Sequence, residues 1–236
     1  MDLIIQALDK FQIVSNDKTS TYYNQEGIKV PRVTEILSRT IHSDGLMYWA
    51  NSIGLKGEKY RDVLNKAATA GSNAHSAIEM YLNENIKTND NTPFLGFLMW
   101  YNYITTDIKI PIEVIYIEHK IVCKWFGGTL DALMKIGNKI YLVDFKTSNH
   151  VTFNYFLQLA AYRFMLREVE GINVDGVIVL QLDKDEPGFN EYHLSFDIPD
   201  HLYFMENCQT AFLSLVFAFY NLQRIESGFN NLFKET

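Results

Sequence analysis

The stretch "GGTLDALMKIGNKIYLVDFKTS", residues 127–148, decides the predicted fold. Gly137-Asn138 lies between two apolar segments and predicts a two-residue type II′ turn, because glycine suits the first central position of that turn. The turn pairs Ile136 with Lys139 and joins strands 128–136 and 139–147 into a hairpin. Both faces of this hairpin are largely apolar, a pattern typical of strands that helices cover on both sides.

Three charged residues interrupt the apolar pattern. The register places Asp131 opposite Asp144, with Cβ atoms roughly 5 Å apart, and Leu130 opposite Phe145. Strand alternation puts Lys146 on the face of Asp144. Two carboxylates at this separation repel each other by about 3 kcal/mol at an effective dielectric constant near 20. A divalent cation such as Mg²⁺ or Mn²⁺, or the ammonium of Lys146, is needed to offset this repulsion. The alternative is a solvated hairpin with surface ion pairs.

The composition limits the class of protein. The chain has 236 residues, 47% hydrophobic and 21% charged, which suits one globular domain. We expect no membrane-spanning helix and no signal peptide. Cys123 and Cys208 cannot supply the four thiolates of an iron–sulfur cluster, and two cysteines indicate a reducing, cytoplasmic compartment, the host cytoplasm if the protein is viral. The net charge of −7 argues against a uniform nucleic-acid coat but allows a local basic groove.

The pattern along the chain predicts a mixed β-sheet flanked by helices, of α/β or α+β class, in a single domain spanning 1–236. The expected strands are 112–124, 128–136, 139–147, 174–183 and 190–196. The expected helices are a short one after Pro31, then 56–83 with a bend or break near Gly71, 92–107, 151–169 and 199–224. A small hairpin is expected within 11–24, turning at Asn16-Asp17. The parts are a mostly helical segment 1–110, a catalytic sheet with a crossover helix 111–198, and a C-terminal helix 199–236.

Two helices carry polar residues that could face the hairpin. His75 falls inside the apolar stripe of its helix and Glu79 falls at the edge of that stripe, one turn away. A histidine in this position is either a metal ligand or a satisfied core residue. On the later helix, Gln158 and Tyr162 share a face, where they either join the site or simply pack over the sheet. Two acids lie on the strand before the hairpin, Glu113 and Glu118. Each of them faces either the site or water.

Four motifs in this order resemble the PD-(D/E)XK nuclease superfamily, in particular its RecB-like branch, which includes phage exonucleases and the mitochondrial genome maintenance exonuclease. They are "GSNAHSAIE" (71–79), "GTLD" (128–131), "DFK" (144–146) and "QLAAY" (158–162). The resemblance covers roughly residues 71–183. It implies a restriction-endonuclease-like fold in which a mixed central sheet is flanked by helices, with a helical N-terminal elaboration.

The resemblance also implies a metal centre. His75, Asp131 and Asp144 would bind Mg²⁺ or Mn²⁺, helped by the backbone carbonyl of Phe145. Glu79 completes the first motif and is counted with the catalytic residues.

Catalysis would depend on three further residues of the motifs. Lys146 would orient or deprotonate the attacking water and stabilise charge on the phosphate. Gln158 and Tyr162 would hold the site and the scissile strand.

The expected partner is DNA, with single-stranded or double-stranded ends, together with proteins of replication or recombination. Trp125 and Phe126 could stack on unpaired bases, or belong to the core. The candidates for a basic groove are Lys56, Lys59, Arg61, Lys66, Lys124, Arg163 and Arg167.

The favoured function is a metal-dependent DNA exonuclease of phage-type replication, recombination or repair. A structure-specific endonuclease or junction resolvase with the same site is one alternative, and a catalytically inactive DNA-end binding protein is the other.

Overall fold

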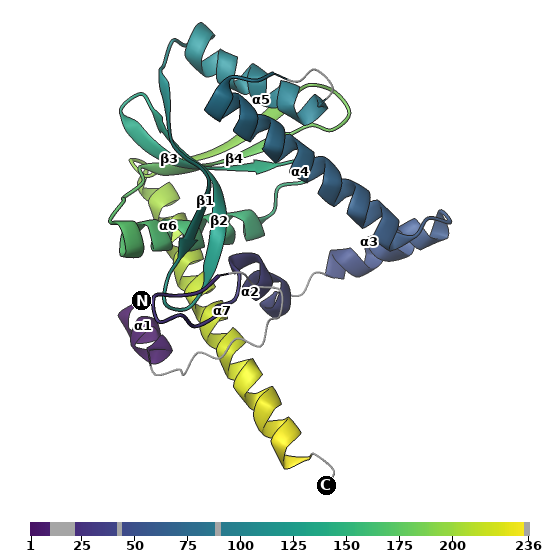
Figure 1. The fold of residues 1–236 in the computed structure, drawn as a ribbon, viewed down its shortest axis with the longest axis vertical. Helices are drawn as coiled ribbons and strands as arrows, with labels where there is room; N and C mark the ends of the chain where they lie inside the picture. Colours follow the sequence, from purple (N-terminus) through teal and green to yellow (C-terminus); the bar gives the residue numbers. More distant parts are fainter. Residues whose placement is uncertain (10–21, 42–43, 88–90, 234–236) are drawn as a thin grey trace.

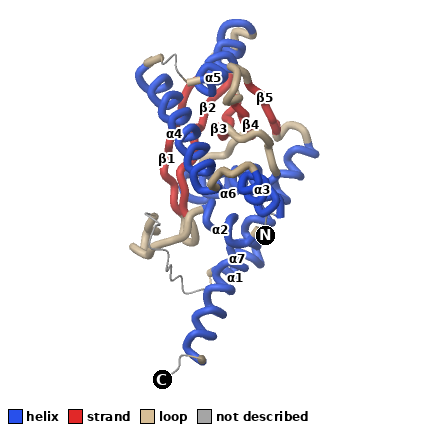
Figure 2. The backbone as a smooth tube through the Cα atoms, turned by 90° about the vertical axis from the view of Figure 1, so that its right-hand side faces the viewer, coloured by secondary structure: helices blue, strands red, loops and turns tan. Residues whose placement is uncertain are grey.

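A computed structural model of the chain describes residues 1–9, 22–41, 44–87 and 91–233. Its centre is a five-stranded mixed sheet in the order β1-β2-β3-β4-β5, with helices on both faces (Figures 1 and 2). The strands are β1 Ile112–Val122, β2 Gly127–Ile136, β3 Lys139–Lys146, β4 Gly176–Leu182 and β5 Phe189–Ser195. The mixed sheet and the approximate bounds of all five predicted strands are therefore confirmed.

The helices before the sheet are α1 Asp2–Leu8, α2 Val33–Thr40, α3 Asp44–Leu55, α4 Tyr60–Glu84 and α5 Thr92–Asn102, which continues as a π-helical turn, η1 Tyr103–Asp107. The later helices are α6 Phe153–Glu170 and α7 Pro199–Leu232. The sequence patterns predicted neither α1 nor α3. The predicted hairpin within 11–24 lies almost entirely outside the described residues.

Two predicted helix boundaries are wrong. Helix α4 begins at Tyr60 rather than at residue 56 and is continuous through Gly71. Helix α7 ends at Leu232 rather than at Arg224, and it passes through Gly228. A glycine inside a helix costs only about 1 kcal/mol relative to alanine, so it does not terminate a helix by itself.

One pair of neighbouring strands in the sheet is parallel. The pairs β1–β2, β2–β3 and β4–β5 are antiparallel, whereas β3 and β4 are parallel. Parallel neighbours need a crossover connection, and α6 provides it. The carboxyl ends of β3 and β4 therefore lie side by side, with Lys146 opposite Gln181.

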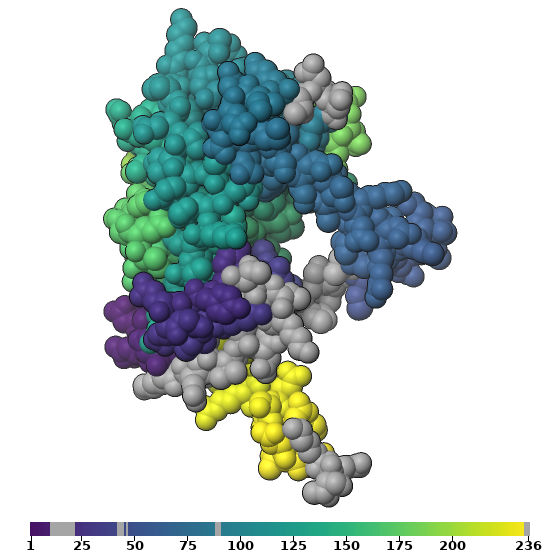
Figure 3. All heavy atoms as spheres, in the orientation of Figure 1, coloured from purple at the N-terminus to yellow at the C-terminus, as the bar shows by residue number. Residues whose placement is uncertain are grey.

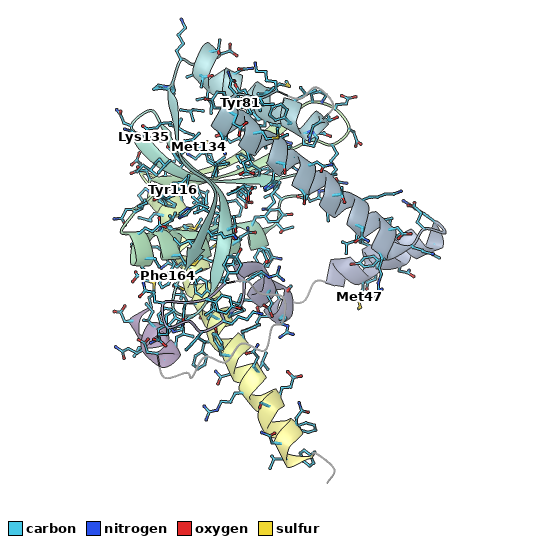
Figure 4. The ribbon with its side chains drawn as sticks, viewed as in Figure 1. Met47, Tyr81, Tyr116, Met134, Lys135 and Phe164 are labelled. Carbon is cyan, nitrogen blue, oxygen red and sulfur yellow. The ribbon has the colours of Figure 1, made fainter. Side chains whose placement is uncertain are left out.

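Two apolar cores lie on the two faces of the sheet. Leu133 and Leu142 belong to a core that α2, α6 and α7 cover, and Phe164 of α6 lies in it. Met134 and Val143 belong to a second core under α4 and α5. Figure 4 shows Tyr81 of α4 and Phe164 of α6 on opposite sides of the sheet. Within the described residues, no helix is long and apolar enough to cross a membrane.

The predicted hairpin register is confirmed from Ile136–Lys139 to Ala132–Val143, with Gly137 at a φ of 62° in the turn. The predicted contact of Leu130 with Phe145 is wrong, because these residues belong to opposite cores. The main-chain ladder between β2 and β3 ends at Ala132–Val143, and beyond it the regular alternation of faces no longer holds.

Candidate functional site

The site forms where β2 and β3 stop pairing. Asp131 of β2 and Asp144 of β3 are both buried at this point. Asp131 Oδ2 accepts a hydrogen bond from the backbone N–H of Phe145 at 2.8 Å, in the place of the next ladder bond. A side-chain carboxylate is thereby held between the two strands just beyond their last ladder pair. Its second oxygen is left to face α4.

A strained residue on β1 lies next to Asp131. The β1–β2 ladder pairs Ile117 with Ala132 and His119 with Leu130, so Glu118 is level with Asp131 without forming a ladder pair. Glu118 has a φ of 46°, in the left-handed region that a residue with a Cβ rarely adopts. Such strain costs on the order of 1–3 kcal/mol and is concentrated at functional sites. The unusual backbone turns the Glu118 carboxylate out of the strand alternation, toward His75.

His75 of α4 joins the three strands together. Its Nδ1 donates to Glu118 Oε1 at 3.0 Å and lies 3.7 Å from Asp131 Oδ1, while its Nε2 donates to the Phe145 carbonyl at 3.1 Å. Burial lowers the pKa of His75, but the hydrogen bond to Glu118 and the charges of Asp131 and Glu118 outweigh it and raise the pKa to about 9. Both ring nitrogens therefore carry a proton at neutral pH in the metal-free protein.

Asp144 is the most buried acid of the site, with 2% of its surface exposed. Its Oδ1 accepts from Lys146 Nζ at 2.6 Å and from Gln158 Nε2 at 3.4 Å. Among the described residues, its Oδ2 finds no hydrogen-bond partner. Burial raises the pKa of Asp144, and Asp131 adds to the rise while Lys146 opposes it, which leaves the pKa at about 7. A buried carboxylate oxygen without a partner is costly unless a ligand completes it.

The ammonium of Lys146 is held at the edge of this cluster. Its side chain is 17% exposed, pairs with Asp144 and lies 5.0 Å from the centre of the Tyr155 ring. Burial lowers the pKa of Lys146, but the charges of Asp144 and Asp131 outweigh it and raise the pKa above its ordinary value. Lys146 is therefore a permanent cation here. It is suited to donate hydrogen bonds rather than to accept a proton.

Tyr162 supports the site from α6. Its ring is buried, and burial together with the charges of Asp131 and Asp144 raises its pKa well above the ordinary range. A Cβ added to Gly128 would lie 2.6 Å from Tyr162 Cε1, so the ring packs directly on the backbone of β2. Glycine at position 128 is thus required for the close approach of the tyrosine.

Two cavities adjoin the cluster. The larger, of about 480 Å³, is lined by Gly71, Ser72, His75, Ser76, Glu79, Glu118, Lys120 and Thr129. The smaller, of about 220 Å³, lies at the carboxyl ends of β3 and β4 and is lined by residues 147–149, 181–185 and Asn190. Crevices at the carboxyl ends of parallel strands are common ligand sites in α/β proteins.

The donor set fits a divalent cation. Ligand atoms of His75, Glu118 and Asp131 lie within 4.8 Å of one another. Carboxylate oxygens suit Mg²⁺ and Mn²⁺, whereas an imidazole suits ions such as Zn²⁺ and Fe²⁺, so the set fits a divalent cation without identifying it. Asp144, which the sequence predicted as a ligand, is not part of this group, in which Glu118 stands instead. Its Oδ2 has no hydrogen-bond partner among the described residues. In the metal-free protein, protonated His75 and Lys146 offset part of the negative charge of these acids.

Most of the residues predicted from the sequence come together in this region. They are His75, Glu79, Asp131, Asp144, Phe145, Lys146, Gln158 and Tyr162. The solvated hairpin is wrong, because Asp131 and Asp144 are buried. The sequence left open which of two glutamates faces the site. Glu118 does, whereas Glu113 lies 4.0 Å from Lys135, on the exposed end of β1. No sequence signal marked the left-handed backbone of Glu118.

Three of the residues predicted to contact DNA, Lys124, Trp125 and Arg163, lie away from this site. Trp125 is 8% exposed and packs in the core with Phe126, so stacking of these rings on bases does not fit the structure. Lys124 Nζ pairs with Asp9 at 2.6 Å. Arg163 donates to Gln209 of α7 at 3.1 Å. Trp125 thus packs against α6 and Arg163 contacts α7, whereas Lys124 forms an ion pair on the surface.

Comparisons with known proteins do not identify a family for this chain. No protein-family model matches the sequence. No curated protein matches it either. Among solved structures, the chain is similar to one described as "Crystal structure of SSO0001", with 12% identity over 91% of this chain and 84% of that chain. The TM-score of 0.33 is too low to support an argument about fold or function.

Proposed function

We propose that this protein is a Mg²⁺- or Mn²⁺-dependent deoxyribonuclease of restriction-endonuclease-like fold that degrades DNA from its ends. The observation that carries the proposal is the ion pair between Lys146 and the buried Asp144, next to a cluster able to hold a cation. A purely structural metal site needs ligands but has no need for an ammonium at its edge. Hydrolysis of a phosphodiester needs both, because negative charge develops on the phosphoryl oxygens.

The residues of the site have separate roles in this proposal. His75, Glu118, Asp131 and Asp144 would hold the cation together with the Phe145 carbonyl. A cation bound there supplies Lewis-acid polarisation of the scissile phosphate.

Lys146 donates hydrogen bonds to the phosphate and to the attacking water. Because its pKa is raised, it stabilises charge rather than removing a proton. Asp144 positions the ammonium of Lys146, and Gln158 in turn holds Asp144.

The N-terminal helices support a DNA substrate that has ends. In Figure 1, α3 and the beginning of α4 project from the sheet as an arm. Four basic residues of this arm are exposed: Lys56, Lys59, Arg61 and Lys66. His75 lies on the same helix α4, about 21 Å along the axis from Arg61 at a rise of about 1.5 Å per residue. A backbone held along this arm would be directed to the cavity beside His75, which favours exonuclease over endonuclease action.

The test compares end-labelled linear DNA with a covalently closed circle of the same sequence. Purified protein should degrade the linear molecule to short products in Mg²⁺ or Mn²⁺ and leave the circle intact. In a chelator it should cleave neither molecule. Nicking of the circle at a similar rate would favour the endonuclease alternative. Binding of linear DNA without any cleavage in either metal would leave only the end-binding alternative.

A further inference from the structure

The carboxyl end of β4 carries a polar side chain among apolar ones. In β4, which the structure describes completely, all seven residues are buried, and Gln181 is the only one with a polar side chain. A buried amide in an apolar strand costs free energy unless it is hydrogen-bonded, whereas an apolar residue would fill the same space without that cost. The reason for glutamine at this position therefore lies in what its amide contacts.

Gln181 belongs to a row of side chains across three strands. It is the ladder partner of Lys146 on β3 and of Asn190 on β5. Ladder partners point to the same face of a sheet. On this face of β4, Val177 and Val179 belong to the core that α6 covers. Gln181 therefore lies directly beside Lys146, on the face that meets α6.

Both ends of the amide of Gln181 are hydrogen-bonded. Its Oε1 accepts from Asn190 Nδ2 at 3.3 Å, and its Nε2 donates to the carbonyl of Ser148 at 2.7 Å. Because Ser148 lies two residues beyond Lys146, the second bond holds the chain where it leaves the sheet. Ser148 Oγ in turn donates to the carbonyl of His150 at 3.0 Å. Gln181 thus links β5 to the connection between β3 and α6.

This connection borders open space on one side. The cavity of about 220 Å³ is lined by its residues 147–149, so the protein does not pack against them there. On the other side α4 crosses in front of the sheet (Figures 1 and 3), and a Cβ added to Gly71 would lie 3.5 Å from Thr147 Oγ1. The end of a strand opens locally when few contacts hold it. The hydrogen bond from Gln181 opposes such opening on the side of the cavity.

We propose that Gln181 is a positioning residue, which holds Lys146 beside Asp144 by fixing the chain directly after Lys146. The segment from Asp144 to Lys146 is then held on both sides by side chains. From β2, Asp131 accepts the backbone N–H of Phe145 beyond the last ladder pair. From β4, the amide of Gln181 adds a hydrogen bond beyond the last pair of the parallel ladder.

The same connection leads into α6, which contributes further neighbours of the ion pair. Tyr155 places its ring 5.0 Å from Lys146 Nζ, and Gln158 donates to Asp144 Oδ1 at 3.4 Å. Loss of the bonds of Gln181 would therefore loosen the ammonium both from its own strand and from α6. The action of Lys146 on a phosphate rests on the proposed function, whereas its position does not.

Gln181→Leu tests the proposal, because leucine fills the space of the side chain but makes neither hydrogen bond. An amine-reactive N-hydroxysuccinimide ester of acetic acid measures how accessible Lys146 is, with Lys135 as the internal reference in peptide mass spectrometry. The side chain of Lys146 is 17% exposed and that of Lys135 is 46% exposed, so Lys146 should react slowly in wild type. Gln181→Leu should raise its relative labelling several-fold. The kcat for DNA cleavage should fall about tenfold with KM unchanged, the scale of one lost hydrogen bond.

Gln209→Leu is the matched control for lost stability. Gln209 of α7 is 1% exposed, and its amide accepts from Arg163 at 3.1 Å and donates to Met1 Sδ at 2.8 Å. This variant should lower the melting temperature by a similar amount, but leave the labelling of Lys146 and the kcat as in wild type. Equal effects of the two variants would overturn the proposal, since they would follow from lost stability alone. Wild-type labelling of Lys146 in Gln181→Leu would overturn it as well.

Asn190→Ala gives a milder test at an exposed position. It removes only the bond to Gln181 Oε1 and should shift labelling and kcat in the same direction by less. If Gln181→Leu does not fold, wild-type labelling of Lys146 in Asn190→Ala would refute the proposal. A wild type without nuclease activity would refute the proposed function alone, because the labelling still decides what holds Lys146 in position.

Discussion

Cation binding should expel a proton from His75. An imidazole must be neutral to bind a metal ion, but the pKa of about 9 means that His75 is protonated at pH 7 in the metal-free protein. The two pH units between 7 and 9 correspond to about 2.7 kcal/mol, or a hundredfold in affinity. The affinity for Mg²⁺ should therefore rise by nearly tenfold per pH unit from pH 7, and level off near pH 9.

The same proton stabilises the metal-free fold. The pKa of His75 in the folded protein is raised above its ordinary value of 6.5, so the stabilisation is complete below pH 6.5 and is lost as the pH rises through 9. The rise of the pKa from 6.5 to about 9 corresponds to about 3 kcal/mol in the free energy of unfolding. Solvent screening reduces this little, because the side chain is only 26% exposed. His75→Gln should remove this dependence and be less stable than wild type mainly on the acid side.

Calorimetric titration with Mg²⁺ at pH 7, 8 and 9 measures both affinity and proton release, if each pH is repeated in two buffers of different ionisation enthalpy. Asp144, with a pKa of about 7, is already ionised above pH 8, so the proton released there comes from His75. His75→Gln provides the control and should release no proton above pH 8. An affinity that is constant from pH 8 to pH 9 in the wild type would refute the assignment of His75 as a ligand.

Two further substitutions separate catalysis from structure. Lys146→Met should lower the DNA cleavage rate at saturating DNA by about a hundredfold or more, while Mg²⁺ affinity stays the same or rises because a nearby positive charge is lost. Lys135→Met, at the far end of β2, is the matched control, and a Lys146 variant that cleaves within a few-fold of wild type would exclude the proposed role. Gly128→Ala should displace Tyr162, since the new Cβ would lie 2.6 Å from the ring, and should lower the melting temperature and the cleavage rate. Gly71→Ala meets only Thr147 at 3.5 Å and should be neutral or slightly stabilising in thermal melts, so equal effects of the two glycine substitutions would contradict the packing described for Tyr162.

The sequence by itself determined the features that depend on local geometry. The Gly137-Asn138 turn fixes the hairpin register as far as Ala132–Val143, and Asp131 and Asp144 are the residues directly beyond that last pair. Helical spacing likewise identified His75 as a residue that faces the core. Such predictions succeed because turn type and the periods of strands and helices are set by neighbours in the chain.

Tertiary structure decided what these residues contact. Glu118 enters the site only because β1 adopts a left-handed conformation beside Asp131, and that strain is stabilised by His75 from a distant helix. Trp125 looked equally suited to a base or to the core, and it is packing against Phe164 of α6 that buries it. The charge states of the site also depend on the fold, since burial and the distances between groups far apart in the sequence set each pKa. Periodicity gives the direction of a side chain along its own element, whereas the partner it meets depends on how the elements pack.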